Sequence, residues 1–283
     1  MKRFILLSFL IISISAVAQK DPRLLGICAV TDFNSEPYAA WYKPNYENYT
    51  PTADIIAQLK KLGPEKFKLK IVFGSWCGDS KRELPKMMKV LNAAGFSEKN
   101  IELIGVYDSL EVYKQAPKRE EKGLNIYRVP TFIVYQKGVE VGRIVEYPVE
   151  SLERDLLKIV SGQPYTHSYK GYAQINAWLK EGLLGDTNIN PRGLAQQIRN
   201  DVARETDLNS CGYVLLMRKD VKEAINVFRI NINLFPQSPN CFDSLGEAYL
   251  MAGMKDESKA CYQRVLELDP QNSNAKAQLE KLN

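Results

Sequence analysis

One cysteine stands at a point where a strand gives way to a helix. Residues 70–76 form an apolar run followed by a tight turn, and residues 78–85 begin a helical pattern directly after Cys77. A thiol at the start of a helix faces unpaired backbone N–H groups and the positive end of the helix dipole, and both favour the thiolate form. The sequence therefore predicts a nucleophilic thiolate at Cys77, with the Ser80 hydroxyl and the Lys81 cation within reach of its sulfur.

The residues around this cysteine resemble a known motif. Residues 76–80 read Trp-Cys-Gly-Asp-Ser, which is similar to the Trp-Cys-Gly-Pro-Cys motif of the thioredoxin superfamily, with Asp in place of the proline and Ser in place of the second cysteine. Pro85 lies where thioredoxins carry a helix-kinking proline, and residues 128–131, Arg-Val-Pro-Thr, resemble the cis-proline loop that faces their active site. The resemblance covers residues 50–162.

This resemblance implies an α/β thioredoxin-like fold with a mixed central sheet. It gives catalytic roles to Cys77 and Ser80, and it implies a cis peptide bond between Val129 and Pro130. A substrate in extended conformation would then bind the main chain of Val129 beside the sulfur. The residues expected to contact substrate are Trp76, Gly78, Asp79, Val129, Pro130 and Thr131.

The replacement of the second cysteine by Ser80 limits the chemistry. In a dithiol thioredoxin the second thiol releases the reduced substrate, and a hydroxyl cannot do this. A single thiol can still attack a disulfide and hold a mixed disulfide, so isomerase-like or mixed-disulfide-reductase chemistry remains. Protein thiols and disulfides are the expected substrates, and an external thiol or reductase partner must complete the cycle.

The elements that position Cys77 follow from the periodicity of residues 50–162. Helical spacing predicts helices over 52–62, 78–94 and 151–160, and apolar runs or alternation predict strands over 67–73, 101–107, 131–135 and 139–145. This order predicts a mixed sheet covered by helices on both faces. Residues 114–122 have no apolar stripe and predict a solvated helix face or loop.

The N-terminal residues predict export. Residues 1–18 combine Lys2 and Arg3 with an apolar run and an Ala-Val-Ala site, which is typical of a secretory signal peptide. The expected location is therefore the periplasm or outside the cell, with no stable membrane insertion. Residues 19–49 predict an irregular extension that packs on the next domain through aromatic side chains, namely Tyr38, Trp41, Tyr42 and Tyr46.

A second cysteine lies in this extension. Cys28 has two interpretations, either as the thiol that resolves a disulfide on Cys77 or as a buried or free thiol. The second interpretation is favoured.

The C-terminal half predicts an all-α repeat array. Residues 163–204 read as a linker followed by a divergent helical hairpin, and a period of thirty-four residues then links Leu208, Gly212, Leu215, Phe228 and Pro236 to Phe242, Gly246, Tyr249, Tyr262 and Pro270. This period is that of tetratricopeptide repeats, so we expect such repeats with a C-terminal cap over residues 205–283. Cys211, Cys241 and Cys261 read as core residues of these helices.

Composition excludes several classes of function. The formal net charge of +5 is modest, and no basic stretch indicates nucleic-acid binding. The five cysteines show neither Cys-x-x-Cys nor zinc spacing, so we expect no metal and no cofactor. The main prediction is an exported monothiol exchange protein acting through Cys77, with the repeats binding a protein or peptide. The alternative is a redox-inactive scaffold of thioredoxin-like fold and repeats.

Overall fold

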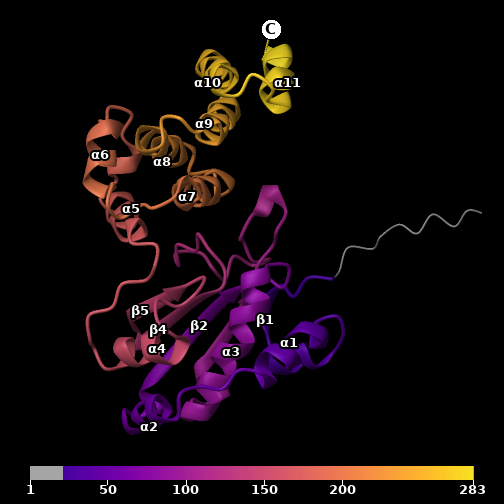
Figure 1. The fold of residues 1–283 in the computed structure, drawn as a ribbon, viewed down its shortest axis with the longest axis vertical. Coiled ribbons are helices and arrows are strands. Elements are labelled where there is room, and N and C mark those ends of the chain that lie inside the picture. The colour runs from indigo at the N-terminus through magenta and orange to yellow at the C-terminus, as the bar shows by residue number, and fades with distance from the viewer. Residues whose placement is uncertain (1–21, 283) are drawn as a thin grey trace, which may run out of the picture.

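The computed structural model describes residues 22–282 and has two parts, a sheet domain and a helical array (Figure 1). The predicted signal peptide lies outside the described residues. Five strands form the sheet: β1 Gly26–Cys28, β2 Phe67–Phe73, β3 Ile101–Gly105, β4 Thr131–Gln136 and β5 Val139–Val145. Four helices accompany them: α1 Ala39–Glu47, α2 Ala53–Lys61, α3 Gly78–Ala94 and α4 Leu152–Val160.

The sheet is mixed, with the strand order β1-β3-β2-β4-β5. Strand β2 lies in the centre, parallel to β3 and antiparallel to β4. Its last residues are buried on both faces, as its apolar sequence predicts. Val72 near the end of β2 pairs with Thr131 at the start of β4, so the segments that lead to Cys77 and away from Pro130 lie side by side.

The two faces of the sheet are covered by different kinds of structure. The sequence predicted helices on both faces, and this prediction is wrong for one of them. Leu69 and Ile71 of β2 share one core with side chains of all four helices α1–α4. Val72 points to the opposite face and packs instead with Ala116, Ile126 and other residues of the irregular segment 106–129. The helices therefore cover one face, and this irregular segment covers the other.

The prediction of a solvated surface over residues 114–122 is wrong for several of its polar residues. Lys114, Gln115 and Glu121 are buried. They are buried because their polar atoms have partners: Gln115 Nε2 donates to the carbonyl oxygen of Met217 at 3.0 Å, and Glu121 accepts from the backbone N–H of Ala116 at 2.9 Å.

The N-terminal extension is more regular than its sequence predicts. It adds β1 to the sheet edge, antiparallel to β3, and it forms helix α1. The predicted aromatic packing is present, since the Phe33 and Tyr42 rings stack with centroids 4.6 Å apart and join the core beneath α3. Aromatic packing stabilises a helix that contains Pro44 and has little helical periodicity of its own.

Seven helices form the array above the sheet domain (Figure 1). They are α5 Gly171–Lys180, α6 Pro191–Ile198, α7 Glu205–Met217, α8 Val221–Leu234, α9 Pro239–Met251, α10 Lys255–Leu268 and α11 Ser273–Leu282. The pairs α7 and α8, and α9 and α10, form hairpins of repeat type. A Cβ atom on Gly212 would lie 2.5 Å from the Phe228 ring, so the small residue lets α8 approach α7 closely.

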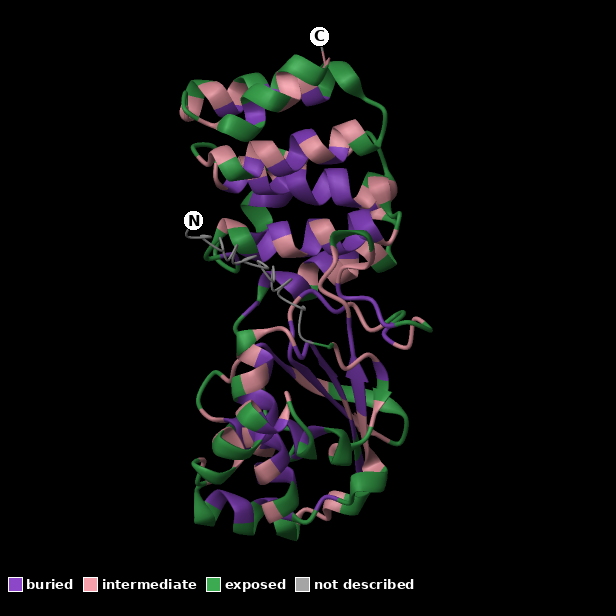
Figure 2. Cartoon of the chain, turned by 90° about the vertical axis from the view of Figure 1, so that its right-hand side faces the viewer, coloured by how far each residue is buried: buried purple, intermediate pink, exposed green. Residues whose placement is uncertain are grey.

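The array and the sheet domain share buried residues. Tyr127 and Val145 of the sheet domain belong to the same apolar core as Tyr172, Leu208 and Cys211 of the array. Figure 2 shows buried residues in the loops at this junction as well as inside both parts. Within residues 22–282, no helix has the length and apolar character needed to cross a bilayer.

Candidate thiol site

Cys77 lies between the end of β2 and the start of α3, where the sequence places it. It is the residue that precedes the helix, and its carbonyl accepts the first helical hydrogen bond from the backbone N–H of Lys81 at 2.9 Å. The turn before it is closed by a bond from the N–H of Cys77 to the carbonyl of Gly74 at 2.9 Å. The thiol is half-buried, so a reagent has access to it.

The thiol meets the loop that precedes β4. The Cys77 thiol donates to the carbonyl oxygen of Val129, with a distance of 3.3 Å between Sγ and O. The peptide bond between Val129 and Pro130 is cis. Thr131 is buried and donates through Oγ1 to the carbonyl of Arg128 at 2.7 Å. The structure therefore brings the Cys77 thiol to the Val129 carbonyl, and the buried Thr131 hydroxyl bonds within the same loop.

Trp76 forms one wall beside the thiol. Its Nε1 donates to the carbonyl of Val106 at 2.8 Å, and its ring lies 6.3 Å from that of Tyr113. A Cβ atom on Gly74 would lie 2.5 Å from the indole, so this position requires glycine.

The remaining predicted residues lie at the start of α3. Ser80 is fully buried, and its hydroxyl accepts from the backbone N–H of Gly74 at 3.1 Å, so this side chain stabilises the turn. Gly78 is exposed, and Asp79 pairs with Arg82 at 2.5 Å.

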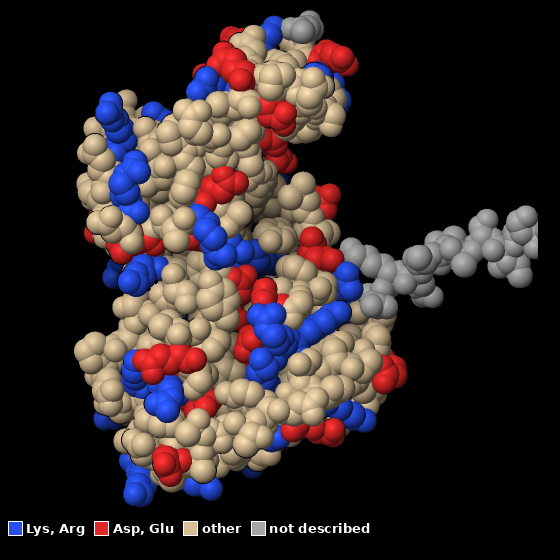
Figure 3. Space-filling model, in the orientation of Figure 1, with Lys and Arg blue, Asp and Glu red and all other residues tan. Residues whose placement is uncertain are grey.

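Basic side chains lie along α3. Figure 3 shows Lys and Arg gathered over α3, below the junction of the two parts. The helix carries Lys81, Arg82, Lys86 and Lys89 but only two acids.

A lysine that the sequence did not indicate belongs to the same neighbourhood. Lys114 is only 4 % exposed, and its Nζ donates to the Tyr113 hydroxyl at 2.6 Å and to Ser210 Oγ at 3.2 Å. Burial, assisted by the positive charge of Arg128, lowers the pKa of Lys114 to about 7, while negative charge at Cys77 acts in the opposite direction. Its position within a polar run gave no signal of burial, and Ser210 lies almost a hundred residues away.

Arg128 joins the site loop to the array. Its guanidinium donates to the carbonyl of Thr206 at 2.7 Å and pairs with Glu146 at 3.4 Å. Burial raises the pKa of Glu146, which Arg128 opposes. Helix α7 thus lies beside the loop that carries Val129.

The other four cysteines are not brought to Cys77. Cys28 packs with the core on the helix-covered face, whereas Cys77 packs with the core on the opposite face. Burial raises the pKa of Cys28 to about 11 and that of each of the three array cysteines to about 12. Cys28 therefore lacks both the position and the ionisation expected of a resolving thiol.

A pocket of about 340 Å³ opens between the two parts. It is lined by Asp108, Leu110 and Tyr113 of the irregular segment, by Arg128, and by Thr206, Ser210 and Tyr213 of the α7 region. Tyr113, which lines this pocket, also packs against the Trp76 ring beside the thiol.

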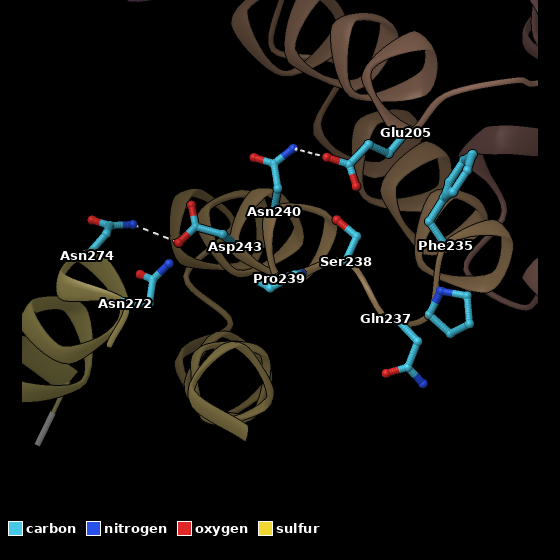
Figure 4. Close-up of a pocket in the computed structure, with 10 residues that line it drawn as sticks. Glu205, Phe235, Gln237, Ser238, Pro239, Asn240, Asp243, Asn272 and Asn274 are labelled. Carbon is cyan, nitrogen blue, oxygen red and sulfur yellow. Dashed lines mark hydrogen bonds between the residues drawn. The ribbon is translucent and has the colours of Figure 1, made fainter. Parts of the chain in front are cut away.

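A second pocket of about 720 Å³, lined mainly by polar residues, lies on the array where α7, α9 and α11 begin (Figure 4). Asn240 donates to Glu205 at 3.0 Å, and Asn274 donates to Asp243 at 2.7 Å. None of its lining residues is Lys or Arg.

The comparison with known protein families finds a match within the helical array. The tetratricopeptide repeat family matches residues 239–272, which contain α9 and α10. Residues 239–272 form a tetratricopeptide repeat. This match confirms the second predicted repeat, and it does not include Cys77.

One similar solved structure is the NMR structure of the second TPR domain of the human RPAP3 protein in complex with an HSP70 peptide. The sequence identity is 22%, the match covers 41% of this chain and 93% of that chain, and the TM-score is 0.29. No curated protein matches this chain.

Proposed function

We propose that this chain binds protein partners through its helical array. The observation that carries this function is the tetratricopeptide repeat over residues 239–272, together with the hairpin of α7 and α8 stacked before it. Stacked helical hairpins of this kind present an extended surface suited to peptides and proteins. The pocket at Asn240 and Asn274 is the candidate contact surface.

Partner binding is tested with the full chain and a paired substitution, Asn240→Ala with Asn274→Ala. Asn188→Ala is the matched control, because Asn188 is also exposed but lies outside the pocket. Partners cross-linked to the wild-type chain and quantified by mass spectrometry should be depleted in the pocket variant and retained in the control. The same partners in the same amounts from both variants would contradict binding at this pocket.

A second function, thiol–disulfide exchange at Cys77, is favoured by one specific observation. The Cys77 sulfur lies at the N-terminal end of α3, half-exposed and 3.3 Å from the carbonyl of Val129, which precedes the cis Pro130. Together with the mixed sheet, this arrangement supports the thioredoxin resemblance and a monothiol mechanism. The proposed location is outside the cytoplasm, supported by the signal-like residues 1–18.

The proposed exchange has two steps. The Cys77 thiolate attacks one sulfur of a substrate disulfide, the S–S bond breaks, and the leaving thiolate takes a proton from water. The group that was attacked stays on Cys77 as a mixed disulfide. An external thiolate then attacks the sulfur of that group. The bond to the Cys77 sulfur breaks, a new disulfide with the external thiol forms, and Cys77 is restored as a thiolate.

Exchange is tested with a mixed disulfide of glutathione and a cysteine-containing peptide, with glutathione as the external thiol. The wild-type chain should accelerate release of the peptide thiol, Cys77→Ser should show only the uncatalysed rate, and Cys28→Ser should retain the wild-type rate. A wild-type rate equal to that of Cys77→Ser would leave the redox-inactive scaffold as the function.

A further inference from the structure

The pocket of about 340 Å³ between the two parts adjoins the thiol site at two points. Its lining residue Arg128 directly precedes Val129, whose carbonyl oxygen lies 3.3 Å from the Cys77 sulfur. Its lining residue Tyr113 packs against the ring of Trp76, the residue before Cys77, with the ring centroids 6.3 Å apart. The pocket is therefore next to any substrate that is held on Cys77.

Helix α7 of the array supplies one wall of this pocket. Thr206, Ser210 and Tyr213 all line it, and their spacing of four and three residues places them on one face of the helix. The wall is fixed to the thiol site, because the Arg128 guanidinium donates to the carbonyl oxygen of Thr206 at 2.7 Å. The pocket exists only because the array lies against the sheet domain.

The hydroxyl groups of the lining already have partners in the protein. The Tyr113 and Ser210 hydroxyls both accept from the Lys114 amine, at 2.6 and 3.2 Å. The Tyr213 hydroxyl donates to the Glu247 carboxylate at 2.8 Å. These side chains therefore offer a ligand mainly their carbon atoms.

The charged groups of the lining are also paired. Asp108 pairs with Arg23 at 2.9 Å, and Arg128 pairs with Glu146 at 3.4 Å. Leu110 adds an apolar side chain that is 50% exposed. A polar or charged ligand group would lose water here without gaining a new partner, whereas an apolar group gains from burial. Aromatic rings in the lining favour an aromatic group in particular.

We infer that the pocket between the two parts is a subsite of the thiol site, and that it takes an apolar, preferably aromatic, side chain of the peptide whose cysteine is joined to Cys77. This inference rests on the proposed exchange function of Cys77. It gives the array a direct role in substrate choice, because α7 then helps to decide which protein disulfides the thiol accepts.

The test measures how well short peptides compete with glutathione for Cys77 in the full chain. Glutathione disulfide first converts Cys77 to its mixed disulfide with glutathione. The thiolate of a five-residue peptide with a central cysteine then attacks the Cys77 sulfur, glutathione leaves as its thiolate, and the peptide stays on Cys77. Mass spectrometry of the Cys77 fragment gives the equilibrium ratio of the two adducts. One peptide has alanine at its other four positions, and the rest carry a single Phe or Glu at each of these positions in turn.

At least one Phe position should raise the ratio of peptide to glutathione about tenfold over the alanine peptide, because burial of a Phe side chain is worth at least this factor. Glu at the same position should give no increase. Leu110→Ala removes apolar lining and Thr206→Trp fills the pocket from α7, so each should lower the Phe preference at least about threefold. Both side chains are exposed, so neither change disturbs a core. Val149→Ala is the matched control, because Val149 is also exposed and apolar but lies outside the pocket, and it should keep the preference.

Three results would overturn the subsite while leaving exchange at Cys77 intact. They are equal ratios for the Phe and alanine peptides, a preference for Glu, and a Phe preference that survives either lining variant. If neither glutathione nor any peptide forms an adduct at Cys77, the exchange function itself is contradicted, and the subsite with it.

Discussion

Two cysteines, Cys77 and Cys211, lie near Lys114 and oppose the lowering of its pKa, and their surroundings differ. Cys77 precedes helix α3, is half-exposed and donates only to the carbonyl of Val129. Cys211 lies inside helix α7, is fully buried, and has its pKa raised to about 12 by that burial. The two thiols therefore differ in helix position and in access to solvent, the two properties on which thiol reactivity depends.

A glycine follows each of these two cysteines, and the two glycines differ in the space around them. Gly78 follows Cys77, and a Cβ atom there would meet nothing within 4 Å. Gly212 follows Cys211, and a Cβ atom there would lie 2.5 Å from the Phe228 ring. The space beside Gly78 is thus open, and the space beside Gly212 is closed by the packing of α8 against α7.

The largest expected effect concerns Lys114. Burial lowers the pKa of Lys114 from 10.5 to about 7, so the unfolded state binds more protons between these values and the folded state gains stability as pH rises. Relative to Lys114→Met, the free energy of unfolding of the wild type should increase by about 1.4 kcal/mol per pH unit, or about 4 kcal/mol from pH 7 to 10. Urea unfolding of both chains measures this difference, and parallel pH profiles would contradict a buried amine.

The two glycines give a matched pair for the next effect. Gly212→Ala should lower the free energy of unfolding by about 3 kcal/mol, because the methyl group overlaps Phe228 in a packed core. Gly78→Ala should change it by less than about 0.5 kcal/mol. Denaturant titration of both variants checks the pair, and equal losses would mean that the two regions are packed alike.

A smaller effect is expected in the segment between α4 of the sheet domain and α5 of the array. His167 is half-buried, its Nδ1 accepts from the N–H of Tyr169 at 3.2 Å, and burial lowers its pKa from 6.5 to about 4. Stability contributed by the neutral ring is present above pH 6.5 and is lost as pH falls toward 4. Between pH 6.5 and 4.5 the wild type should lose about 2 kcal/mol more than His167→Asn, which keeps an acceptor. Equal losses in acid unfolding would show that this ring stays accessible to protons.

The sequence predicted the local parts of the site better than its surroundings. The strand, turn and helix around Cys77 depend on neighbouring residues, so their pattern was visible in residues 70–85. The repeat over residues 239–272 was visible for the same reason, because the period places equivalent residues at fixed spacing. Local patterns of this kind do not depend on the rest of the fold.

Other features could not be predicted because their partners are far away in the chain. The burial of Lys114 and Gln115 depends on Ser210 and Met217 of α7, about a hundred residues later. The strand and helix of the N-terminal extension depend on pairing with β3 and on aromatic packing beneath α3. Such long-range contacts override the polar or irregular character of the local sequence.

The most direct test of the contrast is to measure alkylation of all five cysteines in the folded chain at neutral pH, resolved by peptide. Cys77 should react at least about tenfold faster than Cys28, Cys211, Cys241 and Cys261, because the three array cysteines are buried and desolvation raises the pKa of all four thiols. If another cysteine reacts first, or if Cys77 reacts only after the chain unfolds, Cys77 is not the reactive thiol of this protein.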